Sequence, residues 1–395
     1  MTHFNKYIFL ALSIFFLNNK SNAQLSDQAQ ISLLTCAEGE DIYSLFGHSA
    51  IRVNDPVNNI DNCYNWGMFE FDSDEIVFAT KFTKGRLKYY MDEQDFGYFM
   101  MEYDYFQRTV KEQLLNLTHE QKNNLWKALK ENYLPENRVY KYDFFFDNCA
   151  TKMRDIVHDV VGADLIFSGD YLTEKRSFRD LLREMNGAMP WISLGMDIAL
   201  GAPIDPKATP EEHMFLPNYV LSGFENATVM KNGIDRPAIK SERMIFQPVE
   251  KETKKGLLRP IVVFSVLMLM VLGLTFRDYK NKSRSKYLDF IIFLITGIVG
   301  VLVILLWTAT EHDGMRNNLN VLWAFAPNLV VAFYLLKTNP PKWVRSYARL
   351  TFILLIMMVL IWTVGVQVYS TALIPFVLLV GLRYFFLWQK GLAKP

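Results

Sequence analysis

The sequence predicts an α+β domain followed by an all-α membrane domain, and three observations lead to this fold class. Residues 24–255 mix short strand-like and helix-like segments rich in Phe and Tyr. Residues 256–395 contain long apolar runs that approach the roughly 20 residues needed to cross a bilayer. The first 23 residues have the composition of an export signal. The chain is therefore expected to divide into an exported domain and a membrane domain.

Charge is nearly balanced, because 42 Lys and Arg residues are matched by 41 Asp and Glu residues. Such a chain has no strong electrostatic field to attract nucleic acid. The sequence contains neither a glycine-rich phosphate-binding loop nor a cluster of residues spaced as metal ligands. We expect no nucleic-acid partner, no metal and no cofactor.

The export signal is predicted over residues 1–23. Lys6 provides the basic start, residues 7–17 the apolar core, and residues 21–23 a small-residue cleavage site. No cysteine follows Ala23, so the signal is not that of a lipoprotein. We expect cleavage before Gln24, with a retained N-terminal anchor as the alternative.

Alternation and capping patterns predict the elements of the exported domain. Residues 49–53 alternate polar and apolar side chains and predict a strand, and residues 63–69 predict a second strand that pairs with it as a hairpin. Thr118 and Gln121 form a capping-box pattern that predicts a helix running to Asn132.

Five membrane-spanning helices are predicted after the exported domain. The third predicted helix is the shortest, and it contains Pro327 and Asn328. Their expected bounds are about 257–276, 287–309, 320–336, 350–369 and 371–388.

Basic residues alternate between the loops that join these spans. Loops 277–286 and 337–349 are rich in Lys and Arg, whereas loop 310–320 contains only Arg316. Cytoplasmic loops carry the excess of Lys and Arg, so these two basic loops are expected in the cytoplasm. The exported domain then lies outside and the C-terminus inside, in agreement with the export signal.

A candidate nucleophile follows the stretch of residues 142–148. Asp147 and Asn148 can cap a helix that begins near Cys149. The positive end of a helix dipole favours the thiolate, which is the nucleophile of covalent acyl chemistry. The alternative is that Cys149 is a buried free cysteine with no chemical role.

A nucleophilic cysteine needs a base and a group that orients the base. His48 is the best candidate for the base, because it stands beside Gly47 at the start of a predicted strand in the exported domain. Asn65 on the next predicted strand is the candidate orienting residue. Asp55 and Asp147 are the alternatives for that role.

The chain has three cysteines, an odd number for an exported domain. One arrangement is a disulfide between Cys36 and Cys63 that leaves Cys149 free. In the other arrangement all three stay reduced and two of them are packing residues.

Five motifs stand out in the predicted exported domain. They are GHSAIRV at 47–53, YNWGMF at 64–69, QLLNLT at 113–118, FDNCAT at 146–151 and FLP at 215–217. These motifs resemble the Lnb-type lipoprotein N-acyltransferases of Bacteroidetes. Glu311-His312 and residues 318–320 resemble an outer loop of that family's membrane domain. The order of a histidine before an Asn-Cys pair is also similar to circularly permuted NlpC/P60 proteins, which are papain-like, and to lecithin:retinol acyltransferases.

This resemblance implies a function. A family member in the inner membrane moves an acyl chain from a phospholipid or lipoprotein ester, through a cysteine thioester, to the α-amino group of a diacylglyceryl-cysteine. Cys149 matches the nucleophile and His48 the base, whereas Asn65 is inferred from strand order alone. Glu311, His312 and Asn318 are expected to contact the lipoprotein acceptor.

Two other classes of protein fit some of these residues. A membrane-anchored Cys-His amidase or peptidase acting on cell-envelope substrates needs a peptide groove, and it explains five spans poorly. A non-catalytic envelope scaffold is the third reading, and there Cys149 is a core residue.

Overall fold

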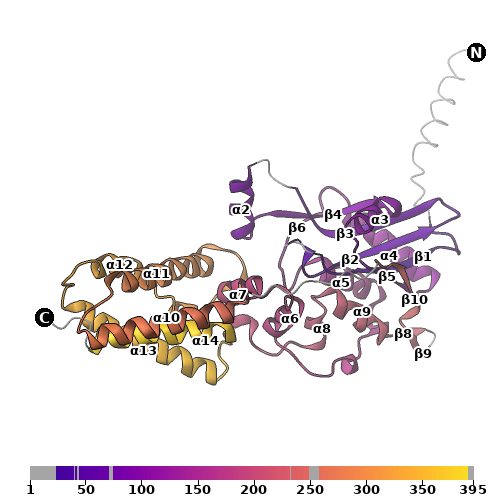
Figure 1. Cartoon of the computed structure of the whole chain (residues 1–395). Helices are drawn as coiled ribbons and strands as arrows, with labels where there is room; N and C mark the ends of the chain where they lie inside the picture. Colours follow the sequence, from indigo (N-terminus) through magenta and orange to yellow (C-terminus); the bar gives the residue numbers. More distant parts are fainter. Residues whose placement is uncertain are drawn as a thin grey trace, which may run out of the picture.

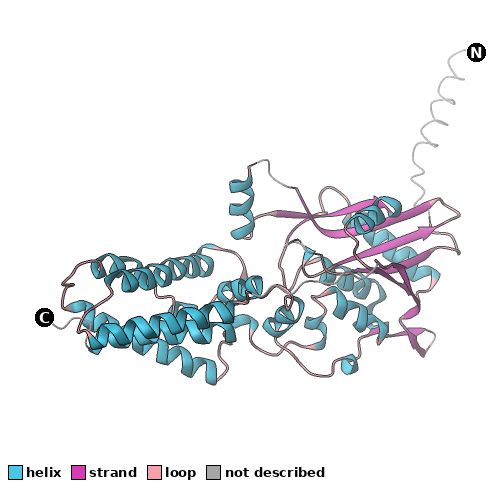
Figure 2. Cartoon of the chain, viewed as in Figure 1, coloured by secondary structure: helices cyan, strands magenta, loops and turns pink. Residues whose placement is uncertain are grey.

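A computed structural model describes residues 24–39, 41, 44–70, 74–231, 233–248 and 258–389. Figure 1 shows a compact N-terminal part joined to a bundle of helices built from the C-terminal part of the chain. Within the described ranges, strands occur only in the N-terminal part (Figure 2). An α+β domain followed by an all-α domain is therefore confirmed. The predicted export signal, residues 1–23, lies outside the described residues.

The N-terminal part is built around a seven-stranded sheet with the order β10-β5-β1-β2-β3-β4-β6, and every neighbouring pair is antiparallel. The predicted hairpin is confirmed as β2 and β3. The strands are β1 (Gln30–Cys36), β2 (His48–Asp55), β3 (Ile60–Phe69), β4 (Lys88–Asp95), β5 (Val110–Leu115), β6 (Val139–Lys141) and β10 (Ile239–Phe246).

Helices cover both faces of this sheet. One face packs against α4, α5 and α9, and the other packs against α3. The capping box of Thr118 and Gln121 starts α4, as predicted. The four helices are α3 (Phe96–Tyr105), α4 (His119–Asn132), α5 (Cys149–Val161) and α9 (Pro217–Glu225).

Alternation along the strands decides which side chains face which helices. Ile51 of β2 packs in the cluster that contains α5 residues. Ala50, its neighbour in sequence, packs in the cluster that contains Phe99 and Tyr103 of α3. Both side chains are fully buried. The central strands therefore have no solvent-exposed face, and the candidate site can only open at their ends.

Smaller elements connect the sheet to the membrane part. The helices are α2 (Glu75–Thr83), α6 (Phe178–Met185), α7 (Pro190–Ala199) and α8 (Pro210–His213), and a second sheet contains β7 (Leu165–Ile166), β8 (Thr228–Lys231) and β9 (Ile234–Pro237). Single 3-10 turns are η2 (Gly162–Asp164), η3 (Gly169–Tyr171), η4 (Ala202–Ile204), η5 (Asp313–Met315), η6 (Leu319–Leu322) and η7 (Thr371–Leu373).

Arg179 is the polar centre of this connecting region. Its side chain is 1% exposed and forms salt bridges with Asp197 at 3.1 Å and Asp205 at 2.7 Å. It also donates to the carbonyl oxygens of Leu200 and Gly201. A buried cation with this many partners holds α6, α7 and the following turn in one arrangement.

Among the described residues of the C-terminal part, four helical segments are long and apolar enough to cross a membrane. The last of them, Thr371–Gln389, comprises η7 and α14. The five helices of this part are α10 (Pro260–Lys280), α11 (Lys286–Ala309), α12 (Asn328–Leu335), α13 (Trp343–Thr363) and α14 (Ile374–Gln389).

Two predicted spans differ from the structure. The segment 320–336 is not one helix: it contains the end of η6, a turn and the eight-residue α12. Pro327 cannot donate a helical hydrogen bond, and the Asn328 side chain bonds instead to Thr296 and Tyr384. The span predicted at 350–369 is α13, which begins earlier, at Trp343, and ends at Thr363.

The predicted disulfide is not formed, because Cys36, Cys63 and Cys149 are all free. Cys36 is paired with His48, whereas Cys63 is paired with Arg52, on the other side of β2. Two strands separated by a third lie about 10 Å apart, beyond the roughly 7 Å that a disulfide can span between Cα atoms. Cys36 and Cys63 are packing residues under α3.

The topology can be tested with an impermeant thiol reagent on cells whose inner membrane is intact. Ser283→Cys, in the exposed turn between α10 and α11, should stay unlabelled because its basic loop is expected in the cytoplasm. Tyr105→Cys is the positive control, because Tyr105 is 81% exposed on α3. Both variants also carry Cys149→Ser. Equal labelling at the two positions would contradict the topology.

Candidate active site

Cys149 is the first residue of α5, as predicted, and Asn148 caps the helix. The Asn148 Oδ1 accepts from the backbone N–H groups of Ala150 at 2.8 Å and Thr151 at 3.0 Å. The Thr151 hydroxyl in turn accepts from the Asn148 backbone at 2.8 Å. These bonds form a capping box, so the position of Cys149 is set by local hydrogen bonds.

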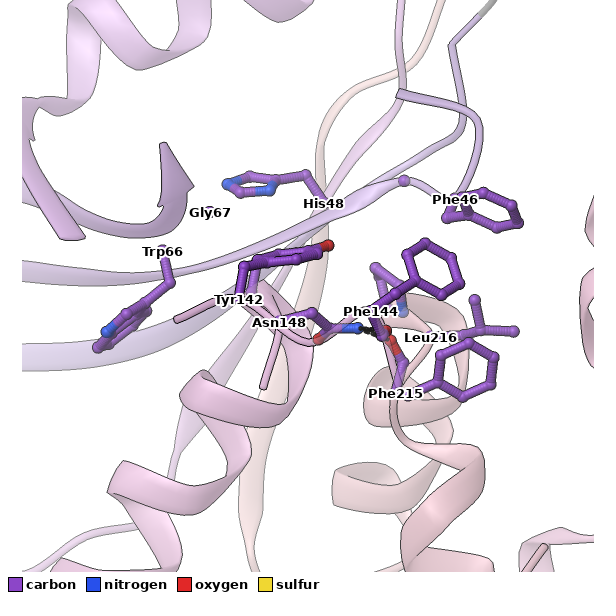
Figure 3. Close-up of a pocket in the computed structure, with 12 residues that line it drawn as sticks. Phe46, His48, Trp66, Gly67, Tyr142, Phe144, Asn148, Phe215 and Leu216 are labelled. Atoms are coloured by element: carbon purple, nitrogen blue, oxygen red, sulfur yellow. Dashed lines mark hydrogen bonds between the residues drawn. The ribbon is translucent and has the colours of Figure 1, made fainter. Parts of the chain in front are cut away.

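The Asn148 side chain also joins the helix start to two distant segments. Its Nδ2 donates to the carbonyl oxygens of Phe144 and Phe215, each at 2.8 Å (Figure 3). All the hydrogen-bonding capacity of the amide nitrogen is used, and the residue is 4% exposed. Cys149 is thereby held against the two phenylalanine-containing segments that border it.

His48 is the first residue of β2, and a tight turn at Gly47 leads into it. Gly47 has a φ of 77°, which favours glycine. A Cβ atom there would lie 2.6 Å from the carbonyl oxygen of Cys36, so the close approach of the two segments excludes any side chain. The turn fixes where the half-buried His48 side chain begins.

Asn65 of β3 lies next to His48, and its Oδ1 is 3.1 Å from the imidazole Nε2. An amide oxygen only accepts hydrogen bonds, so this contact assigns the proton of a neutral ring to Nε2. The Nδ1 is then left as an acceptor. Asn65 is 1% exposed, and among the described residues its Nδ2 finds no hydrogen-bond partner.

His48 and Cys149 approach from opposite faces of the sheet. The side chains of His48 and Ala50, two residues apart in β2, point to the face that α3 covers, whereas α5 packs on the other face. The β2–β3 ladder extends only to the pair Ala50 and Asn65 at this end, so the strands separate beside His48. Gly67, with a φ of 84°, lies at the separation, and a Cβ there would lie 3.8 Å from that of Cys149.

One cavity contains both candidate residues. The space between and in front of its walls, open solvent included, is about 490 Å³. Much of the lining is aromatic or aliphatic, as Figure 3 shows. The lining residues are Phe46, Gly47, His48, Trp66, Gly67, Tyr142, Phe144, Asn148, Cys149, Phe215, Leu216 and Pro217.

Burial leaves the candidate pair uncharged at neutral pH. Desolvation lowers the pKa of His48 to about 4, although the hydrogen bond that His48 donates to Asn65 raises it. Desolvation raises the pKa of Cys149, against the effect of the backbone N–H groups of Ser49, Ala150 and Cys149 itself. The backbone N–H groups at the helix start favour the thiolate, as expected, but burial outweighs them.

Glu311 and His312 lie away from the cavity and contact the exported domain. Glu311 forms salt bridges with Arg86 at 2.8 Å and Lys141 at 2.9 Å. Hydrogen bonds from Lys141 and Arg86 lower the pKa of Glu311 and keep it ionised. The His312 Nε2 lies 3.1 Å from the carbonyl oxygen of Phe82. These contacts join the two parts of the chain.

Asn318 is fully buried. Its Nδ2 donates to the carbonyl oxygens of Ile198 at 2.8 Å and Ala199 at 3.0 Å, at the end of α7. The Asn318 Oδ1 accepts from the Asn320 side chain at 2.9 Å. With its amide already bonded, Asn318 connects α7 to the membrane part and is not carried into the proposed site.

The alternative orienting residues have other partners. Asp55 accepts from Ser26 and Asn58, and its pKa of about 2 keeps it ionised in a turn at the far end of β2. Asp147 forms a salt bridge with Lys152 at 2.7 Å. Neither contacts His48, so Asn65 is the orienting residue the geometry favours. Within the described ranges, no three His, Cys, Asp or Glu side chains are grouped to hold a metal ion.

Sequence reasoning missed residues that the fold brings to the site. Gly67, Tyr142 and Phe46 line the cavity. Gly67 and Tyr142 lie in stretches that the sequence singles out, but nothing in the sequence assigned any of the three to the site. Arg108 is 6% exposed and donates to the carbonyl oxygen of Ala37 at 2.9 Å. It adds to the effect of burial in lowering the pKa of His48. Such contacts depend on the packing of distant segments.

Fold and site together define a class: a membrane protein whose α+β domain, outside the membrane spans, presents a cysteine and a histidine in one cavity with aromatic walls. Comparison with protein families narrows this class. The Lnb N-terminal periplasmic domain matches residues 18–181, and the Lnb transmembrane domain matches residues 251–392. The chain therefore belongs to the Lnb family. No curated protein and no solved structure was found to match it.

The charge state of the site predicts the pH dependence of alkylation at Cys149. The thiolate is the reactive form, and burial raises the pKa of this thiol. The rate of alkylation by iodoacetamide should therefore rise with pH from 6 to 9 by roughly tenfold per unit, without a plateau. Intact-protein mass spectrometry of the detergent-solubilised protein gives the rate.

Cys149→Ser is the control for this experiment, because it reports any slow modification of the buried Cys36 and Cys63. A plateau that is already reached below pH 7 would mean that a thiolate–imidazolium pair exists in the resting protein. That result would contradict the uncharged pair.

Proposed function

We propose that this protein is a lipoprotein N-acyltransferase. It moves an acyl chain from a membrane lipid ester, through a thioester on Cys149, to the α-amino group of a diacylglyceryl-cysteine. The observation that carries the proposal is that Cys149, at a helix start, and His48, held by Asn65, line one cavity whose walls include aromatic side chains. Membership of the Lnb family supports the lipoprotein substrate.

The first half-reaction forms the acyl-enzyme. His48 Nδ1 takes the thiol proton as Cys149 Sγ attacks the ester carbonyl carbon. The tetrahedral intermediate collapses, the C–O bond breaks, and the imidazolium returns the proton to the leaving alcohol. The backbone N–H groups that approach the sulfur stabilise its negative charge. Asn65 keeps Nδ1 unprotonated before the attack.

The second half-reaction transfers the chain. The amine of the acceptor attacks the thioester carbonyl, and His48 Nδ1 takes a proton from the nitrogen. The C–S bond breaks, and the proton returns to the sulfur as the thiol. An ester and an amine are thereby converted into an amide and an alcohol, with no cofactor. The order of a histidine strand before a cysteine helix supports a permuted papain-like arrangement.

Closure of the gap between His48 and Cys149 is part of this mechanism. His48 contacts Asn65 on the face of the sheet that α3 covers, whereas Cys149 lies on the opposite face, with α5. Catalytic hydrogen bonds are often long in empty sites and tighten when substrate binds. Gly67 has no side chain to block movement through the strand opening.

Aromatic side chains give the acyl chain an apolar surface. The Phe46 and Phe144 rings, both at the cavity, lie 4.9 Å apart. They pack against a buried cluster that also contacts Met315, in the loop after α11. Apolar contacts thus extend from the thiol toward the membrane part, as a lipid substrate requires and a hydrophilic peptide does not.

The proposed location follows from the charge pattern of the loops. The catalytic domain lies in the periplasm, the spans lie in the bacterial inner membrane, and the C-terminus is cytoplasmic. Donor and acceptor are then both lipids of the same membrane. A phospholipid and a lipoprotein are each suitable acyl donors, since each has an ester that Cys149 can attack.

Trapping of the acyl-enzyme tests the proposal. Detergent-solubilised protein is incubated with a phospholipid or diacylated lipoprotein whose acyl chain is labelled. Label should appear on the wild-type protein and be released by hydroxylamine, which cleaves thioesters. It should vanish in Cys149→Ser, because a hydroxyl ionises far less readily than a thiol.

Cys63→Ala is the matched control, because Cys63 is buried under α3 and does not line the cavity. It should retain the label. His48→Ala should form much less acyl-enzyme and no amide product. N-acylation by Cys149→Ser at the wild-type rate would rule out covalent catalysis. Hydrolysis of envelope peptides without labelling would favour the amidase instead.

A further inference from the structure

Helix α2 and the turn after it, residues 74–88, form an arm that extends from the sheet domain. Figure 1 shows α2 apart from the sheet, beside the outer end of α11 and with its axis across the direction of the spans. We call residues 74–88 the α2 arm. Spans cross a membrane, so a helix whose axis runs across theirs lies parallel to the membrane surface.

The contacts of the α2 arm place it at the end of a membrane span. The Glu311 backbone N–H donates to the carbonyl oxygen of Lys84 at 3.0 Å. The Arg86 side chain bonds to the Glu311 carboxylate at 2.8 Å. Glu311 comes two residues after Ala309, the last residue of α11. The arm is therefore fixed where the chain leaves the bilayer.

The composition of the α2 arm suits a lipid surface. Val77 is 39% exposed and Phe82 is 50% exposed. Lys81, Lys84 and Lys88 are exposed on the same arm. Interfacial helices combine apolar side chains at the acyl boundary with basic side chains at anionic headgroups.

We propose that the α2 arm lies on the outer leaflet of the membrane that holds the spans, with its basic side chains on anionic lipid headgroups. The bilayer is the occupant of this surface because α11 and the arm meet at its boundary. Lys141 also bonds to Glu311, and its neighbour Tyr142 lines the cavity. Glu311 therefore contacts both the arm and the strand next to the cavity, and it places one edge of the cavity at the membrane surface.

Spin labelling tests this placement in the full-length chain. Single cysteines are placed from position 74 to position 83 in a Cys149→Ser background and labelled with a nitroxide in lipid nanodiscs. Positions on the lipid-facing side of α2 should collide more with oxygen, which concentrates in lipid, than with a water-soluble nickel complex. Accessibility should oscillate with the period of a helix.

Tyr98→Cys is the matched control, because Tyr98 is 72% exposed on α3, on the sheet domain. Its label should favour the nickel complex. If the label at every position of α2 favours the nickel complex as Tyr98→Cys does, the arm is in water and the proposal fails. The proposal also fails if the arm binds a protein partner in place of the bilayer. The measurement needs no acyl transfer, so its outcome is independent of the proposed function.

A second comparison tests the charge. In nanodiscs that contain phosphatidylglycerol, the double variant Lys81→Gln with Lys84→Gln should reduce the preference of the α2 spin labels for oxygen. In nanodiscs of pure phosphatidylcholine, the same variant should change this preference little. Lys111→Gln with Lys127→Gln, on the sheet domain, is the matched control and should have no effect in either lipid. An equal loss in both lipids would show that headgroup charge does not hold the arm.

Discussion

The site depends on the side chain of Asn148. Its oxygen caps α5, and its nitrogen bonds to the carbonyl oxygens of Phe144 and Phe215, so one amide joins the start of the helix to two segments of the cavity wall. Loss of a cap costs about 1 kcal/mol, and an unpaired buried carbonyl adds a penalty of about the same size. The larger consequence is geometric. Without these bonds the start of α5 would lose its links to the two wall segments, and only bonds of the Asn148 backbone, such as that to the Thr151 hydroxyl, would remain. The chemistry of the thiol depends on the position of Cys149 between the strand opening and the aromatic wall.

The separation of β2 from β3 explains how residues from two faces of a sheet share one cavity. Neighbouring side chains in a strand point to opposite faces of the sheet, so a continuous ladder of strands would separate His48 on one face from Cys149 on the other. The ladder extends only to Ala50 and Asn65, and Gly67 leaves the gap free of a side chain. Burial keeps the imidazole and the thiol uncharged until a substrate arrives. An uncharged pair is compatible with a cavity that admits acyl chains, because no ion has to be desolvated there.

Local patterns predicted the fold and the core of the candidate site. The cap at Asn148, the alternation of residues 49–53 and the length of the apolar runs are each encoded within a few residues, so they could be read from the sequence. Contacts between residues far apart in the chain could not be read from the sequence. The pairing of Glu311 with Arg86 joins residues 225 positions apart, and nothing in the sequence distinguishes it from a substrate contact. Cys36 and Cys63 looked like a disulfide because the register that separates them emerges only from the whole sheet. The start of α13 was placed too late because its first turns are basic, a composition that helix ends near the membrane surface tolerate.

The central claim is that this chain adds the amide-linked acyl group to lipoproteins. Mass spectrometry of N-terminal lipopeptides from cells that lack the protein, complemented with the wild-type chain or with Cys149→Ser, measures that group directly. The account predicts diacylated lipoproteins with a free α-amino group in the deletion strain and in the Cys149→Ser strain, and N-acylated lipoproteins where the wild-type chain is restored. Lipoproteins that remain fully N-acylated in cells with the Cys149→Ser variant as the sole copy would contradict it.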